Sequence, residues 1–395
     1  MSWLFPFSLH TTTGFFELSL CIYAFYGLRN FWKRSNHLAD CGRIGIILYA
    51  ITNSTGAMSP ATDYGTMFLT LYAVTAWLEN METEKDTTRY ALLSVMTVFL
   101  ATMKLSCAVF ALLVCYPAVC LLRRKKWKEI VVHILLGMVV LAPFLIRNVW
   151  ITGWFLYPFE GIDLFQVEWK IPLQYLLVDA AQIKVWGRCL FDITLVDMPF
   201  REWFPIWWEA QEHYGQMLFY ANILGMLFGT VNLVQGIWSK RKIRMELVVM
   251  YAAMIASFLF WLFTAAFIRY GLAFLLVLPL LGIGTWMERN RKGLYSIVAG
   301  GLVLLIAACY CPYVDNYMMD LGVFIKHNIR EPYYIFQKEY DESETGVYEL
   351  NGNAVYYSEQ GIVNSYYNCP STCYEDMLLR SELMGDKIED GFQAK

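Results

Sequence analysis

The chain has 395 residues and a formal net charge of −3; 57% of its residues are hydrophobic, 16% are charged, and its mean hydropathy is +0.41. Soluble domains average about 25% charged and about 45–50% apolar residues, so this composition excludes a water-soluble enzyme. Phe, Trp and Tyr supply 17% of the chain, which excludes intrinsic disorder. The sequence has no long basic stretch with interleaved aromatic residues, so it offers no track for a nucleic acid.

Apolar runs predict membrane-spanning helices, because a bilayer core about 30 Å thick requires about 20 apolar helical residues. In the first part of the chain these runs lie at residues 14–32, 42–58, 64–79, 90–103 and 105–122. The last two join in a stretch that is too long for one crossing, so we predict two helices that meet at Lys104. The clearest runs lie at 130–147, 217–238, 246–264, 271–287 and 294–311. The sequence therefore predicts an all-α, polytopic transmembrane bundle of about 9–10 helices.

Basic residues predict the orientation of these helices, because Lys and Arg near helix ends stay on the cytoplasmic side. They form four clusters, at Lys33–Arg34, Arg123–Lys128, Lys240–Arg244 and Arg289–Lys292. If the chain crosses the membrane about ten times, all four clusters lie on the same side of the membrane. This agreement predicts a multi-pass protein of the plasma membrane, in which the turns at 59–63 and 265–270 and the residues around Lys104 face outward.

The predicted spans divide the chain into four parts. They are N-terminal transmembrane helices at 1–147, an outer loop at 148–215, C-terminal transmembrane helices at 216–311 and an extracytoplasmic tail at 312–395. Trp and Tyr in the loop suit a membrane interface, and apolar residues at helical spacing over 172–190 predict a helix along the membrane surface. In the tail, GVYELNG and NAVYYS predict a small hairpin. Cys369 and Cys373 either form a disulfide outside the cytoplasm or are free thiols.

The sequence lacks the usual motifs for nucleotide binding and hydrolysis. Its five histidines have no metal-ligand spacing, so we predict no metal site, and no particular cofactor is indicated. Asp63 opens a helix, where its carboxylate is either a terminal acid stabilised by the helix dipole or a functional acid. Lys104 between two apolar helices costs about 2.5–3.5 kcal/mol unless it finds water or a partner. It either pairs with a phosphate or carboxylate, or extends its ammonium group to the surface.

Several arginines lie on the predicted outer side, against the usual charge bias. Arg147 ends one predicted helix and Arg269 lies in a nearly apolar turn. Each either anchors its helix at the interface or contributes to an outer site, where the planar guanidinium group suits phosphate oxygens. Further candidate contacts at this site are Asn148, Tyr157, Asp163, Arg188 and Arg201.

Four stretches of the sequence resemble the GT-C superfamily, the multi-pass glycosyltransferases that take a sugar from a polyprenyl-phosphate carrier at the outer membrane face. They are SPATD at Ser59–Asp63, the broken helix pair around Lys104, PFLIRNVWITGWFLYPF at Pro143–Phe159, and Arg269-Tyr270 before a helix with Gly and Pro. The chain is also similar to bacterial GT-C-like membrane proteins that share the IRN and YPF string and an ending such as Leu379–Phe392. The resemblance implies transfer of a sugar from a polyprenyl-phosphate donor to a glycan or lipid acceptor of the cell envelope.

The resemblance also implies roles for single residues. Lys104, Arg147 and Arg269 would bind the donor phosphate, and Asp63 would be the base or the acid that positions the acceptor hydroxyl. The catalytic acid of GT-C enzymes lies in an outer loop after the first transmembrane helix, and no such pair precedes residue 14. Since the N-terminus is also predicted to lie outside, we expect the chain to be truncated. The alternatives are a polysaccharide export, flippase or polymerase component, and a non-catalytic membrane protein.

Overall fold

The computed structural model describes residues 11–33, 37–52, 61–83, 86–211, 213–238, 244–289, 330, 344–359, 368–373 and 375–395. These residues form twelve α-helices and five short strands. Five helical segments are long and apolar enough to cross a membrane, at Leu105–Arg123, Trp127–Thr152, Gly215–Gly236, Met245–Thr264 and Ile268–Thr285. The predicted fold class, a helical membrane protein with a small mixed C-terminal part, is confirmed. The predicted span at 294–311 lies outside the described residues.

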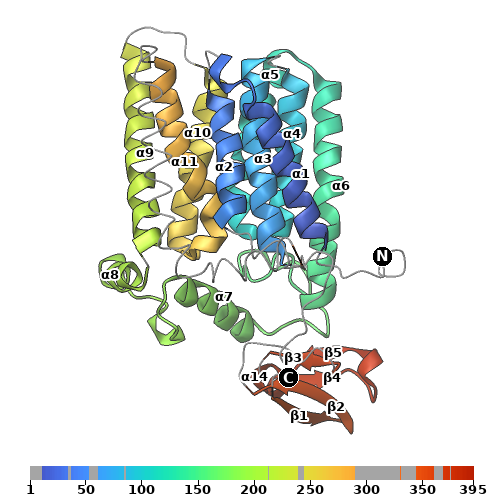
Figure 1. Ribbon diagram of the computed structural model, residues 1–395. Coiled ribbons are helices and arrows are strands. Elements are labelled where there is room, and N and C mark those ends of the chain that lie inside the picture. The colour runs from blue at the N-terminus through green and yellow to red at the C-terminus, as the bar shows by residue number, and fades with distance from the viewer. Residues whose placement is uncertain are drawn as a thin grey trace. The chain divides into compact units, whose positions relative to one another are not determined.

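Apart from two helices in the predicted outer loop, the long helices follow the apolar runs of the sequence (Figure 1). In chain order, the helices up to residue 289 are α1 (Thr11–Leu28), α2 (Leu38–Thr52), α3 (Thr62–Glu82), α4 (Thr87–Met103), α5 (Cys115–Arg123), α6 (Trp127–Thr152), α7 (Leu173–Gly187), α8 (Phe200–Ala210), α9 (His213–Trp238), α10 (Met245–Thr264) and α11 (Ile268–Arg289). Since α7 lies within the stretch 172–190, the helix predicted there is confirmed. Its position along a membrane surface stays a prediction.

The helix pair that meets at Lys104 is also confirmed. Helix α4 ends at Met103, and the backbone of Lys104 is extended, with φ −152° and ψ 120°. The chain then continues as the 3-10 helix η3 (Leu105–Val114), which runs directly into α5. One extended residue between two helical segments therefore allows the chain to reverse its direction across the bundle.

Contacts along the chain divide it into two compact units. The first comprises residues 1–141 and 183–336, and the second comprises residues 142–182 and 337–395. The first unit holds the helical bundle, whose core includes the fully buried side chains of Trp77, Trp203 and Trp261. The second unit combines part of the predicted outer loop with the C-terminal tail.

Small residues bring α9 and α11 close together in the first unit, where the two helices run side by side (Figure 1). A Cβ atom at Gly282 of α11 would lie 2.5 Å from the backbone oxygen of Gly225 of α9. The amide of Asn222, also on α9, donates a hydrogen bond of 2.9 Å to the backbone oxygen of Leu275. Close backbone approach through small residues, supported by a polar contact, is typical of helix pairs in membranes.

Gly282→Ala is expected to destabilise the bundle by about 1–3 kcal/mol, because the added methyl group meets backbone rather than a side chain that can move. Gly137→Ala on α6 is the matched control, since a Cβ atom there meets nothing within 4 Å. The control gains up to about 1 kcal/mol of helix propensity. Thermal unfolding of the detergent-solubilised variants measures both effects, and equal melting temperatures would contradict the close packing of α9 on α11.

The predicted hairpin in the tail is confirmed in the second unit. Strands β1 (Thr345–Leu350) and β2 (Asn353–Ser358) pair antiparallel, and the two-residue turn of Asn351 and Gly352 has positive φ at both residues. Asn-Gly is the dipeptide that this kind of turn favours. The remaining elements are β3 (Ser371–Thr372), which is parallel to β2, α14 (Glu375–Leu379), and the antiparallel pair β4 (Ser381–Leu383) and β5 (Phe392–Ala394).

The disulfide that the sequence left open is not formed. Cys369 and Cys373 are both free thiols in the structure. Ser371 and Thr372 between them pair with β2 as a strand, which keeps this stretch extended. A disulfide requires the two Cα atoms to approach within about 7 Å, and an extended connection works against that approach.

Candidate functional site

Asp63 lies in the first turn of α3, at the end of the first unit where α4 meets η3 and α11 begins. Its Oδ1 atom accepts a hydrogen bond from Nζ of Lys104, and the two side chains form an ion pair. Its Oδ2 atom lies 3.8 Å from Nε of Arg269. The carboxylate therefore stands between two cations that lie 41 and more than 200 residues further along the chain.

The extended backbone of Lys104 places its side chain between α3 and α11. The side chain is 14% exposed and that of Asp63 is 20% exposed, so the ion pair is mostly screened from solvent. The ammonium group also lies over the ring of Tyr270, with Nζ 3.4 Å from the ring centroid. Carboxylate and ring together compensate the cost of an ammonium group between apolar helices.

Arg269 is the accessible member of the group. Its side chain is 65% exposed, one Nη atom donates a hydrogen bond of 3.1 Å to the hydroxyl of Tyr270, and the guanidinium carbon lies 5.0 Å from the centroid of the same ring. Tyr270 thus contacts both cations. We call Asp63, Lys104, Arg269 and Tyr270 the Asp63 cluster; with one carboxylate and two cations, its formal charge is +1. A guanidinium group has five N–H donors, so Arg269 can still bind an anion.

Two other predicted arginines lie elsewhere in the first unit. Arg188 is buried, donates a hydrogen bond of 3.0 Å to the backbone oxygen of Val196 and lies 4.7 Å from the ring centroid of Trp203. Burial lowers the pKa of Arg188, and the nearby charge of Asp197 opposes this shift. These contacts hold the connection between α7 and α8 together, whereas Arg201 on α8 is exposed.

The remaining predicted residues belong to the second unit. Arg147 is exposed on α6, and the buried Asn148 has an amide nitrogen without a hydrogen-bond partner. Asp163 pairs with Lys170, whose ammonium group lies 4.3 Å from the ring centroid of Trp154. Lys170 thus connects the beginning of the segment between α6 and α7, at Trp154, with its end, and Asp163 lies between them.

Tyr157 takes part in a contact between the loop and the tail. Its hydroxyl donates to Oδ2 of Asp179, and Nη1 of Arg380 donates to Oδ1 at 3.2 Å. Burial and the adjacent carboxylate raise the pKa of the Tyr157 hydroxyl. Asp179 therefore joins residues from both segments of the second unit. Among the described residues, no group of three or more His, Cys, Asp and Glu side chains could hold a metal ion.

Residues 1–276 match a family described as a domain of unknown function, DUF8201. The chain belongs to this family. The matched region contains α1 to α10 and the first turns of α11, so all four residues of the Asp63 cluster lie within the DUF8201 region. Comparison with curated proteins and with solved structures gave no match.

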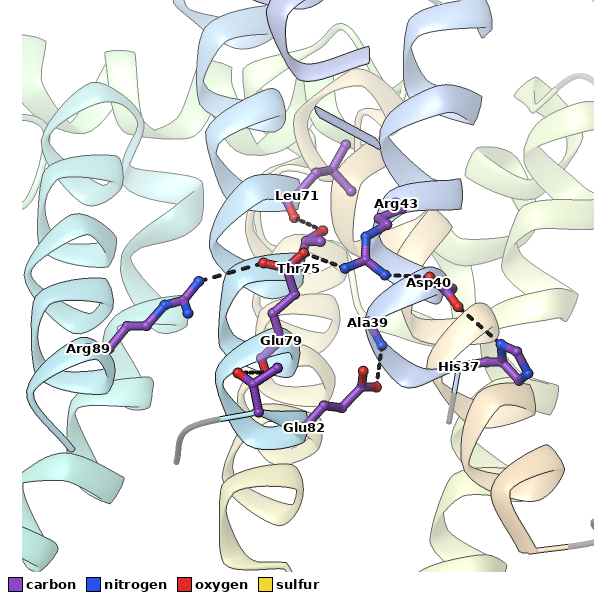
Figure 2. Close-up of polar contacts among 10 residues, drawn as sticks. His37, Ala39, Asp40, Arg43, Leu71, Thr75, Glu79, Glu82 and Arg89 are labelled. Carbon is purple, nitrogen blue, oxygen red and sulfur yellow. Dashed lines mark hydrogen bonds and ion pairs between the residues drawn. The ribbon is translucent and has the colours of Figure 1, made fainter. Parts of the chain in front are cut away.

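A second charged network in the DUF8201 region was not predicted from the sequence (Figure 2). Arg43 of α2 bridges the carboxylates of Asp40, on its own helix, and Glu79, on α3. Arg89 of α4 reaches the other oxygen of Glu79 at 3.6 Å, and Nδ1 of His37 lies 3.0 Å from Asp40. The side chains of Asp40 and Arg43 are only 1% and 5% exposed. We call these five residues the Arg43 network.

The Arg43 network lies at the other end of α2 and α3 from the Asp63 cluster, because Asp63 is in the first turn of α3 and Glu79 in the last. Gly27 of α1 leaves room for the Arg43 side chain, since a Cβ atom there would overlap the guanidinium group. The network therefore links α2, α3 and α4, and α1 packs closely against Arg43. The signal available in the sequence was Arg43 and Glu79 within apolar runs, as a charge inside a membrane helix requires a partner.

Proposed function

We propose that this protein is a membrane glycosyltransferase of the GT-C type, which takes a sugar from a polyprenyl-phosphate donor and transfers it to an acceptor of the cell envelope. The observation that carries the proposal is the Asp63 cluster. Lys104 and Arg269, two cations that the resemblance assigns to the donor phosphate, meet at one carboxylate and one tyrosine.

The direction of the helices supports an outer location of the cluster. Helix α4 begins near the last turn of α5, where Nη1 of Arg124 donates to Oγ1 of Thr87 at 3.2 Å. Arg124 belongs to a basic cluster, and such clusters stay in the cytoplasm. Lys104 lies at the opposite end of α4. We therefore propose that the Asp63 cluster faces the outside of the plasma membrane, as does the C-terminal tail.

The chemistry of the cluster suits a lipid phosphate. Arg269 offers a planar fork of donors, and Lys104 a compact charge. A phosphate that binds both cations replaces Asp63 as their partner, and the cations also stabilise the negative charge that develops on the leaving phosphate. The released carboxylate of Asp63 can then accept the proton of the acceptor hydroxyl. One cluster would thus supply both donor binding and the base.

Arg269→Met is expected to weaken binding of polyprenyl phosphate about tenfold, because it removes charge-assisted hydrogen bonds. Titration of polyprenyl phosphate into the purified protein in lipid nanodiscs, followed by native mass spectrometry, measures the affinity. Arg201→Met is the matched control, since Arg201 is also an exposed arginine but lies outside the cluster. The proposal is wrong if the wild-type protein does not bind polyprenyl phosphate, or if both variants bind it as the wild type does.

A further inference from the structure

Glu17 is the only charged residue of the apolar helix α1. It lies three residues before Leu20 and seven before Ala24, so the three share one face of the helix. Leu20 and Ala24 are buried in the bundle, whereas Leu18 and Ile22 on the other face are more than half exposed. The carboxyl group of Glu17 is therefore directed into the bundle rather than toward lipid.

Among the residues that the structure describes, no side chain or backbone group is a hydrogen-bond partner of the buried Glu17 oxygen. This oxygen is Oε2, and among the described residues no cation forms an ion pair with the carboxyl group. Unpaired carboxyl groups inside a membrane protein are costly to keep and mark functional positions. In native structures a buried polar atom without a partner requires such an explanation.

Aromatic contacts place Glu17 on the inner side of the Asp63 cluster. Phe16 packs on Phe68 of α3 with ring centroids 6.3 Å apart, and Phe68 packs on Tyr49 of α2 at 4.7 Å. Phe68 follows Asp63 by five residues of α3, a rise of about 7.5 Å. The residue next to Glu17 thus contacts α3 about one and a half helical turns further into the bundle than Asp63.

We infer that Glu17 binds hydroxyl groups of the sugar that the polyprenyl phosphate carries. This inference rests on the proposed function, in which the phosphate lies at Lys104 and Arg269. A sugar linked to that phosphate is the next polar group along the donor, and it extends into the bundle while the lipid tail stays in the bilayer. A carboxyl group accepts hydrogen bonds from neighbouring hydroxyls, and aromatic side chains with a few polar groups are the usual lining of a small-ligand site.

The test compares two kinds of lipid. Polyprenyl phosphate alone and polyprenyl phosphates that carry mannose, glucose or galactose are titrated into wild-type protein and into Glu17→Leu in lipid nanodiscs. We expect the wild type to bind at least one glycosylated lipid more tightly than the bare phosphate. Glu17→Leu should weaken that binding about tenfold and leave the affinity for bare polyprenyl phosphate unchanged.

Two further variants make the result specific. Leu18→Ala changes the lipid-facing side of the same helix and should bind both lipids as the wild type does. Glu17→Gln keeps two polar atoms and should lose less affinity than Glu17→Leu. Glu17→Leu should also melt no lower than the wild type, because it removes a buried group without a partner.

The outcomes separate this inference from the proposed function. If wild-type protein binds no polyprenyl phosphate at all, the proposed function fails. If it binds the bare phosphate but no glycosylated lipid more tightly, or if Glu17→Leu affects both lipids equally or neither, the role of Glu17 fails while phosphate binding stands.

Discussion

Arg43→Met is expected to destabilise the bundle by about 3–5 kcal/mol, because it leaves the carboxylates of Asp40 and Glu79 buried without their shared cation. The cost of breaking a buried ion pair from one side is high, because the carboxylates stay shielded from solvent and keep only their contacts with His37 and Arg89. Thermal unfolding of the solubilised protein, together with the yield of folded protein from membranes, measures the effect.

Two comparisons test this explanation. Arg89→Met removes a cation that is 37% exposed and 3.6 Å from Glu79, so it should cost no more than about 1 kcal/mol. The triple variant with Asp40→Asn, Arg43→Met and Glu79→Gln removes all three charges and should recover most of the lost stability. If Arg43→Met and Arg89→Met were equally stable, Arg43 would not be the residue that holds α2 and α3 together.

Asp63→Asn is expected to lower the rate of sugar transfer by about 10²–10⁴-fold, the usual contribution of a general base. The same change should strengthen binding of polyprenyl phosphate, because it removes the carboxylate that competes with phosphate for Lys104 and Arg269. A loss of turnover combined with tighter donor binding distinguishes a base from a residue that only supports the fold. Release of polyprenyl phosphate in membranes that supply envelope acceptors reports turnover.

The control for Asp63→Asn is Asp163→Asn, which neutralises an exposed loop carboxylate that also pairs with a lysine. This variant should transfer sugar at the wild-type rate. Normal turnover by Asp63→Asn would assign the residue to the helix terminus alone, where an acid contributes about 0.3–1 kcal/mol through the helix dipole.

The helices and the hairpin could be predicted from the sequence because the signals for them are local. An α-helix satisfies its backbone hydrogen bonds within its own segment. The length and the ends of such a helix therefore follow from the apolar residues of that segment alone. The interruption by Lys104 and the Asn351-Gly352 turn are likewise properties of short segments. The apolar runs, the helix boundary at Lys104 and the register of β1 on β2 were therefore determined by the sequence itself.

Partners of charged side chains were decided by the tertiary structure. Lys104 could pair with a phosphate or a carboxylate according to the sequence, and in the structure its partner is Asp63, a residue 41 positions away. Arg188 is buried against Trp203 instead of facing an outer site, and Arg43 finds Glu79 on a different helix. From a charged residue in an apolar run, the sequence predicts only that this residue requires a partner. Which partner it has depends on how the helices pack, because the two side chains come from segments that no local pattern connects.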